Sequence, residues 1–184
     1  MMAEITAFLE QSLKLKVNAD KSAVARPWQR KFLGYSVTWH RKPKLKIALT
    51  SRQRLAEKIR QTLRGAQGQS VRQVIAELNP ILRGWVAYFR LTEEKGGLEE
   101  LDGWIRRKVR ALLWRHWKRV YTRAQNLKRA GLSHESAWQS ATNRRGPWWN
   151  GGSSHMNAAY PKSWFDRMKL VSLLAAQRRF SFVS

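Results

Sequence analysis

The segment Leu98–Val120, LEELDGWIRRKVRALLWRHWKRV, is the longest stretch of the chain with helical periodicity. When successive residues are rotated by about 100°, its apolar side chains and one histidine fall on a single stripe. The stripe consists of Leu98, Leu101, Ile105, Val109, Leu112, Leu113, His116 and Val120. Glu99, Glu100 and Asp102 lie near the start, where the helix dipole favours negative charge. The pattern predicts a long helix that buries this stripe, His116 included, in a core.

The other faces of this predicted helix combine cationic side chains with indole rings. They carry Arg106, Arg107, Arg110, Arg115 and Lys118, together with Trp104, Trp114 and Trp117. Lys and Arg neutralise phosphates, and indole rings stack on unpaired bases, so this composition favours nucleic-acid binding. The alternative for the three Trp residues is packing beneath a neighbouring helix, and the pattern does not decide between the two.

The charge of the whole chain is typical of a nucleic-acid-binding protein. Its 184 residues include 36 Lys and Arg against 12 Asp and Glu, which gives a formal net charge of +24. Such a surplus repels itself unless a polyanion neutralises it. Hydrophobic residues make up 43% of the chain and there are ten Trp, so we expect a folded core rather than a disordered chain.

Cationic residues also gather in other parts of the sequence. One set follows Thr50 and contains Arg52, Arg54, Lys58, Arg60 and Arg64. Another lies in the segment before it, at Arg41, Lys42, Lys44 and Lys46. Several separate sets favour an extended polyanion over a small one, although single charged helices are usually just solvated. We also expect a loop contact from Arg144, Arg145, Trp148 and Trp149. The alternative is that these residues form a rigid turn packed on the bundle, which fits Trp148 somewhat better than Arg145.

The first part of the chain predicts a small α+β unit. Apolar spacing in Ala3–Leu15 predicts a helix that runs into a short strand at Leu13, Leu15 and Val17. Partial alternation in Lys31–Trp39 and strict alternation in Lys44–Leu49, separated by Pro43, predict a β-hairpin.

From Thr50 onward, apolar residues recur at the spacing that is typical of α-helices. Thr50 with Gln53 and Ser70 with Gln73 have the spacing of capping boxes and predict two helix starts. The pair Asn79-Pro80 predicts the start of a third helix that Gly96-Gly97 ends. A short helix is expected after Ser133, a loop over 144–154 and a last helix after Ser163. The fold class is therefore mainly α, a helical bundle over residues 50–184 preceded by an α+β unit with a hairpin over residues 1–49.

The sequence gives no local signal for catalysis or metal binding. There is no Cys, and the four His are dispersed without any His-x-x-x-His pattern, so we expect no catalytic residue and no metal site. No apolar run approaches the roughly 20 residues that span a bilayer, and the first ten residues lack the cations of a signal peptide. We expect a soluble, cytoplasmic protein with no membrane contact.

An ordered set of short motifs resembles the C-terminal part of group II intron-encoded reverse transcriptases. The motifs are LKVN at 15–18 with KS at 21–22, KFLGY at 31–35, NPILRGW at 79–85 with YF at 88–89, LD at 101–102 with IRR at 105–107, and GPWW at 146–149. The resemblance implies that residues 1–49 are the end of a polymerase palm and that the helices from Thr50 are the thumb and maturase-specific domain X. Phe32, Leu33 and Gly34 would match the turn of the primer grip, where a glycine lets the backbone approach the primer.

The resemblance also implies a function, in which the helical region binds structured group II intron RNA and assists its splicing. The family's Tyr-Ala-Asp-Asp motif, whose carboxylates hold the ions of two-metal phosphoryl transfer, does not occur in this sequence. We therefore expect no polymerase activity from this chain alone and no cofactor of its own, with Mg²⁺ entering only through the intron RNA or a complete polymerase.

Three other functions stay open at this point. The chain could be one piece of a split reverse transcriptase that works beside a separate fingers–palm polypeptide, with a DNA target among its partners. It could be a decayed fragment without a selected role. A basic DNA-packaging protein is a more distant alternative, because such a protein does not need ten Trp.

Overall fold

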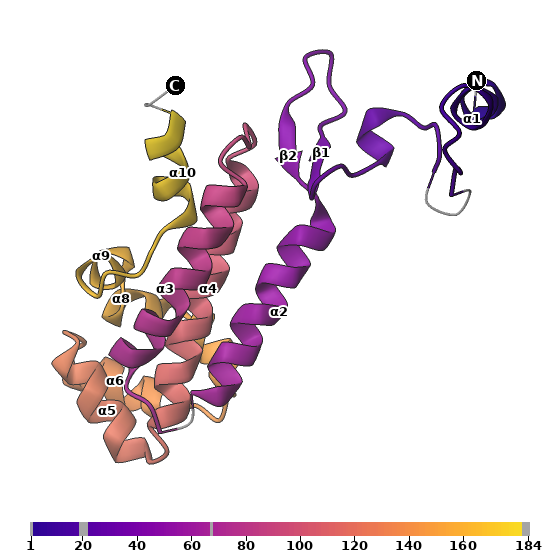
Figure 1. Cartoon of the computed structure of the whole chain (residues 1–184). Coiled ribbons are helices and arrows are strands. Elements are labelled where there is room, and N and C mark those ends of the chain that lie inside the picture. Colours follow the sequence, from indigo (N-terminus) through magenta and orange to yellow (C-terminus); the bar gives the residue numbers. More distant parts are fainter. Residues whose placement is uncertain (1, 19–21, 67, 182–184) are drawn as a thin grey trace.

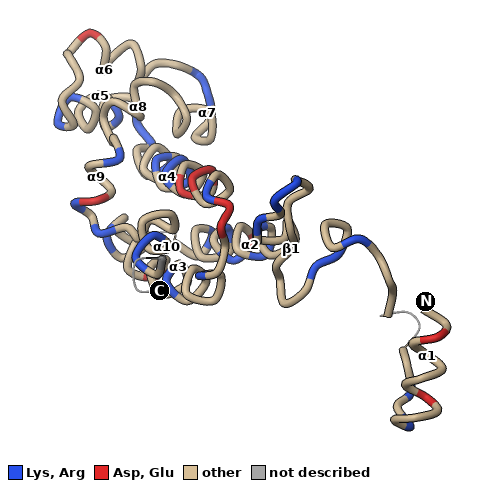
Figure 2. Tube along the Cα trace, turned by 90° about the horizontal axis from the view of Figure 1, so that it is seen from above, with Lys and Arg blue, Asp and Glu red and all other residues tan. Residues whose placement is uncertain are grey.

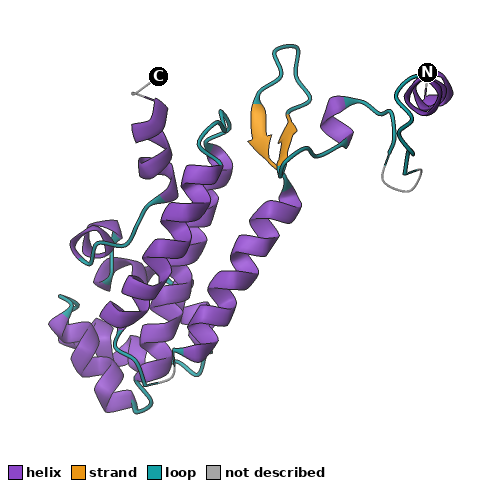
Figure 3. Ribbon diagram, in the orientation of Figure 1, coloured by secondary structure: helices purple, strands orange, loops and turns teal. Residues whose placement is uncertain are grey.

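A computed structural model of the chain describes residues 2–18, 22–66 and 68–181. It is mainly helical, with one small antiparallel hairpin near the N-terminus in the described part, as the sequence predicts (Figures 1 and 3). Lys21, which belongs to the family resemblance, lies outside the described residues.

The N-terminal elements extend away from the bundle (Figure 1). They are α1 (Met2–Gln11), the 3-10 turn η1 (Pro27–Gln29), β1 (Tyr35–Val37) and β2 (Leu45–Ile47). The hairpin pairs Tyr35 with Ile47 and Val37 with Leu45. The strand predicted at Leu13–Val17 is wrong, since that segment continues from α1 without strand pairing. No residue of α1 is buried, so this helix contributes nothing to the core.

Three long helices form the body of the molecule. They are α2 (Leu49–Gly65), α3 (Val71–Tyr88) and α4 (Gly96–His116). α2 buries Leu55, Ile59 and Leu63 at the predicted four-residue spacing. The predicted stripe of α4 is buried from Leu98 to Leu113, which confirms that it faces the core. Burial of these stripes supplies the main stabilisation, at roughly 25 cal/mol per Å² of apolar surface.

Local capping rules place some helix ends correctly and others wrongly. Ser70 and Gln73 form the predicted capping box at the start of α3. The capping box predicted at Thr50 is wrong, because α2 begins at Leu49 and its N-cap is Ala48, two residues before the predicted cap. The long helix ends at His116 rather than Val120, and His116 is half-buried while Val120 is exposed.

The chain does not start a new helix at Pro80, which corrects the prediction of two separate helices. α3 runs through Pro80 without interruption. The preceding Asn79 is buried, and its side-chain amide donates to the Lys169 carbonyl at 2.9 Å and accepts from the Val171 amide at 2.9 Å. These distant contacts hold the helical conformation that proline disfavours in the residue before it.

The C-terminal third wraps around α4 in short helices. They are α5 (Val120–Arg129), α6 (His134–Ala141), α7 (Pro147–Gly152), α8 (Ser154–Ala159), α9 (Lys162–Arg167) and α10 (Leu173–Ser181). Ser133 caps α6 as expected. The loop predicted over 144–154 is wrong, because most of it forms α7 and the start of α8. α10 lies along α3 and α4 (Figure 1).

A buried carboxylate on α4 holds the start of α10. Asp102 accepts hydrogen bonds from the Ser172 hydroxyl at 2.6 Å and from the backbone amides of Leu173 at 2.8 Å and Leu174 at 3.2 Å. The first amides of a helix have no partner within it, so Asp102 acts as a cap supplied by another helix.

A glycine sets the close contact between α7 and α4. A Cβ at Gly151 would lie 2.7 Å from the Arg107 carbonyl oxygen and 2.8 Å from the Ala111 amide nitrogen. Both are backbone atoms, so they cannot move aside as a flexible side chain would. By contrast, a Cβ at Gly84 on α3 would meet nothing within 4 Å.

We predict that Gly151→Ala lowers the free energy of unfolding by about 1–3 kcal/mol, the usual cost of overpacking. Gly84→Ala is the matched control and should raise it by about 0.5–1 kcal/mol, because alanine loses less backbone entropy in a helix. Urea denaturation measures both variants, and an equal response would contradict the close contact at Gly151.

Candidate nucleic-acid interface

α2 presents cations on two different flanks. Arg54 and Lys58 are four residues apart and share one flank, while Arg60 and Arg64 share another. The first flank faces α3 and the second faces α4, because each pair lines a different pocket. Arg52 faces neither pocket and instead forms an ion pair with Glu100 of α4, at 2.6 Å.

The first pocket is an open groove of about 710 Å³ between α2, α3 and the turn before β1, and we call it the α2–α3 groove. It is lined by Leu33, Gly34, Ser51, Arg54, Leu55, Lys58, Pro80, Ile81, Gly84, Trp85, Tyr88 and Phe89. Arg54 and Lys58 are exposed, and the remaining lining is mostly apolar or aromatic. The groove thus brings the predicted primer-grip turn together with two predicted RNA-binding cations.

The predicted primer-grip residues form a tight turn at this groove. Phe32 and Tyr35 exchange backbone hydrogen bonds at 2.9 Å, and Leu33 and Gly34 between them have φ values of +49° and +79°. A side chain at residue 34 would be strained there and would also meet Ser51 Oγ at 2.9 Å, so glycine is required. The side chains of Phe32 and Leu33 are 78% and 65% exposed and project from the turn.

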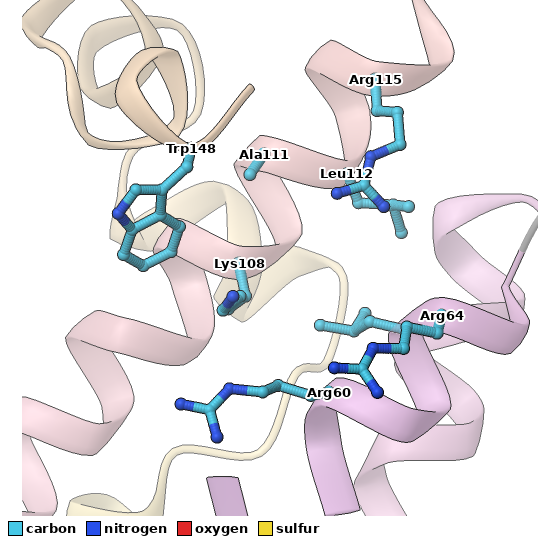
Figure 4. A pocket seen from close by; sticks show the side chains of 8 residues that line it. Arg60, Arg64, Lys108, Ala111, Leu112, Arg115 and Trp148 are labelled. Carbon is cyan, nitrogen blue, oxygen red and sulfur yellow. The ribbon is translucent and has the colours of Figure 1, made fainter. Parts of the chain in front are cut away.

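The second pocket lies between α2, α4 and α7, has a volume of about 160 Å³, and is called here the cation pocket. It is lined by Arg60, Leu63, Arg64, Lys108, Ala111, Leu112, Arg115 and Trp148. Figure 4 shows Arg60 and Arg64 reaching from α2 toward Lys108 and Arg115 of α4. No acidic side chain is among these lining residues. The nearby acid is Glu57, which lies 3.2 Å from Arg60 and 3.8 Å from Arg64.

The pKa of the Lys108 side chain responds to the crowding of positive charge in the cation pocket. Burial lowers the pKa of this ammonium below its usual value, and repulsion from Arg60, Arg115, Arg64 and Arg107 lowers it further. Few negative charges balance this cluster. Across the described chain, many acidic residues lie instead around the start of α4 (Figure 2).

Indole rings support the cations around this pocket. The Arg107 guanidinium lies 3.9 Å from the centre of the Trp148 ring, and the Lys108 ammonium lies 4.5 Å from it. Arg107 also donates to the Trp148 carbonyl oxygen at 3.2 Å, which ties α7 to α4. Arg60 and Lys108 each lie 5.4 Å from the centre of the Trp104 ring. These cation–π contacts help hold the cations together.

The other residues predicted to bind RNA lie on the surface but outside both pockets. Arg106 is half-buried on α4, and Lys118 is exposed between α4 and α5. Arg144, Arg145 and Trp149 are exposed around the start of α7, with the Arg145 guanidinium 5.4 Å from the Trp149 ring centre.

Three residues of the predicted binding set are buried. For Trp114 and Trp117 this is the packing alternative that the sequence left open, whereas the placement of Arg110 off the core was wrong. Trp114 is fully buried and packs beside His155 of α8, and Trp117 is 7% exposed against Tyr160. Arg110 is 6% exposed and donates to the Tyr160 carbonyl oxygen at 2.9 Å. The physical reason is that α7 and α8 cover a second face of α4, which the single apolar stripe does not reveal.

Arg110 stays charged despite its burial. Loss of solvent, with a smaller effect from Arg106, lowers its pKa to about 10, still far above neutral pH. Its contacts with Tyr160 and the Phe165 ring, 5.2 Å away, make it a link between α4 and the segment from α8 to α9.

Lys108 lines the cation pocket although the sequence pattern did not mark it as a binding residue. Arg60 and Arg64 of this pocket belong to the cationic set that follows Thr50. The sequence did contain a sign of this site, because Trp104, Lys108 and Arg115 are spaced so that they share one edge of α4. The spacing cannot show that α2, with its own cations, lies opposite this edge.

Within the described ranges, no group of three or more His, Asp or Glu residues could hold a metal ion. None of the described helices is both long and apolar enough to cross a bilayer.

Residues 52–131 match the family model described as group II intron, maturase-specific domain. The chain therefore contains a group II intron maturase-specific domain. This confirms the resemblance for domain X, and the matched range holds α3, α4 and α5 with nearly all of α2. All four cations of the cation pocket lie inside it, whereas Trp148 lies beyond it. No curated protein matches the chain.

We predict that Arg110→Met lowers the free energy of unfolding of the protein by about 2–3 kcal/mol, because the Tyr160 carbonyl loses a charged donor. Arg106→Met is the matched control one turn away and should change stability by less than about 0.5 kcal/mol. Urea denaturation of both variants tests this, and similar losses would refute the assignment of Arg110 as a structural link.

Proposed function

We propose that this protein binds structured group II intron RNA and assists its splicing, with no polymerase chemistry from its own residues. The observation that carries the proposal is the maturase-specific domain, whose helix α2 bears cations on two flanks, each beside a pocket. The net charge of +24 supports a polyanionic partner of considerable size.

The α2–α3 groove has the composition of a surface for an RNA backbone. Arg54 and Lys58 neutralise phosphates at the rim, while riboses and exposed bases lie against the apolar and aromatic lining. Tyr88, which is 57% exposed, donates from its hydroxyl to the Leu33 carbonyl oxygen at 3.1 Å and so joins α3 to the turn. Mg²⁺ in the reaction belongs to the intron RNA, which carries out the chemistry.

Splicing of the cognate intron at low magnesium, with and without the protein, tests this function. We expect the protein to increase the splicing rate, because bound cations replace part of the Mg²⁺ that RNA folding requires. An unrelated structured RNA of similar length serves as a specificity control. A splicing rate that does not respond to the protein would overturn the proposal.

The variant Arg54→Gln/Lys58→Gln should weaken RNA binding about tenfold or more and make log Kd about 1.5 units less steep in log salt, since two phosphate contacts are lost. The variant Lys128→Gln/Arg129→Gln removes the same charge from the exposed end of α5 and should have a much smaller effect. Gel-shift titrations over a range of salt concentrations measure both. Equal weakening by the two variants would mean that total charge, and not the groove, sets the affinity.

A second candidate function is one part of a split reverse transcriptase, in which residues 1–49 are the end of the palm. Its support is an apolar cleft of about 410 Å³ beside the hairpin, lined mainly by residues 27–37 with Leu45 and Leu91. Phe32 and Leu33 at its edge are strongly exposed, as they would be if a palm partner covered them.

Primer extension tests this second candidate. A separate fingers–palm polypeptide that carries the Tyr-Ala-Asp-Asp motif should gain activity when this protein is added, and Phe32→Ser/Leu33→Ser should abolish the gain. Lys128→Gln/Arg129→Gln is again the control. Extension by this protein alone, or no gain in the mixture, would exclude this function.

A further inference from the structure

The cation pocket holds more positive charge than its surroundings balance. Four cationic side chains line it, and Glu57 pairs with two of them, so the local net charge is 4 − 1 = +3. A phosphodiester carries one negative charge. One phosphate of a regular strand therefore leaves most of this charge unmatched.

The lower part of the pocket is apolar, which strengthens the field inside it. Leu63 and Leu112 are buried beneath the cations, and Ala111 is 6% exposed beside them. Water is excluded from that side, so the cations are screened less than on an open surface. Burial, and to a smaller degree repulsion from the neighbouring guanidinium groups, lowers the pKa of Lys108 in this arrangement.

The pocket is also held in shape before any ligand binds. Trp148 forms one wall, fixed by the hydrogen bond from Arg107 to its carbonyl oxygen. Arg60 and Lys108 rest near the Trp104 ring from opposite helices. A volume of about 160 Å³ equals about five water molecules at their share of liquid volume, enough for one phosphate group with bridging water.

We infer that the cation pocket is a dedicated site for closely spaced RNA phosphates, one seated between α2 and α4 and a second at the rim formed by Arg64 and Arg115. Such pairs of phosphates occur where the backbone of a folded RNA bends sharply or two strands converge. The inference rests on the proposed function, since it assigns the pocket to that RNA. It adds a selective site for folded RNA to the α2–α3 groove.

Inorganic pyrophosphate is the first probe, because it presents two linked phosphates without any nucleoside. At fixed ionic strength it should raise the melting temperature of the protein by several degrees more than sulfate does. Arg64→Gln/Arg115→Gln should lose this difference, because it removes both rim cations and keeps Arg60, Lys108 and Trp148. Lys128→Gln/Arg129→Gln should keep it.

NMR titration of the Lys108 side chain gives a readout that does not depend on melting. Pyrophosphate should raise the pKa of Lys108, because a bound anion opposes the repulsion from its neighbours. Arg115→Gln should raise it without any anion. A pKa that responds to neither change would contradict the electrostatic basis of the site.

Folded intron RNA is the second probe. The double variant at Arg64 and Arg115 should bind it about tenfold or more weakly, and should bind a regular RNA duplex with little change. Equal weakening toward duplex and folded RNA would overturn the selectivity for converging phosphates. Unchanged affinity for folded RNA would overturn the inference and leave the proposed function standing.

Two further outcomes separate the remaining possibilities. If pyrophosphate stabilises the protein through the pocket but the protein does not bind intron RNA, the proposed function fails together with the RNA assignment.

A terminal phosphate is the other source of a doubly charged group. If a 5′-phosphorylated unstructured oligonucleotide binds several-fold tighter than its 5′-hydroxyl form, and the double variant removes that preference, the assignment to a backbone bend is wrong.

Discussion

The burial of α4 governs where the neighbouring helices and the cations of this protein can lie. A chain with a net charge of +24 repels itself, and apolar burial must offset that repulsion. α4 meets α3 and α10 on one side and α7 on another, with the backbone of α7 brought close at Gly151. Because most of its surface is covered, its cations have few directions left. Arg110 enters a buried contact, whereas Lys108 and Arg115 line the pocket that faces α2.

This constraint divides the cations of the maturase domain into two kinds. Arg52 and Arg110 have partners within the protein, an acid in one case and a carbonyl oxygen in the other. Arg64 and Arg115 sit at the rim of a pocket where cations outnumber acids. Cations of the second kind are available to neutralise a phosphate, as are Arg54 and Lys58 at the α2–α3 groove. The indoles divide likewise, with Trp114 in the core and Trp148 beside the cations.

The sequence predicted local features well where the deciding contacts are local. The four-residue spacing of Leu55, Ile59 and Leu63 and the capping box at Ser70 involve neighbours within one or two turns, and both are confirmed. It failed at Pro80, where local rules favour a helix start but Asn79 bonds to a segment 90 residues away. It left the position of Trp114 open, because the helices that cover this residue come much later in the chain.

Composition, apolar period and ordered motifs are properties of the linear chain, so the amino-acid order alone predicts a helical, strongly cationic protein similar to group II intron maturases. Which cations face one another depends on how the helices pack. Helical period assigns a residue to a face, but the charge opposite that face comes from another helix about 50 residues away, as with Arg60 and Lys108. The electrostatic field at a site is the sum of the contributions from charges that lie near it in space, and the fold determines which charges those are.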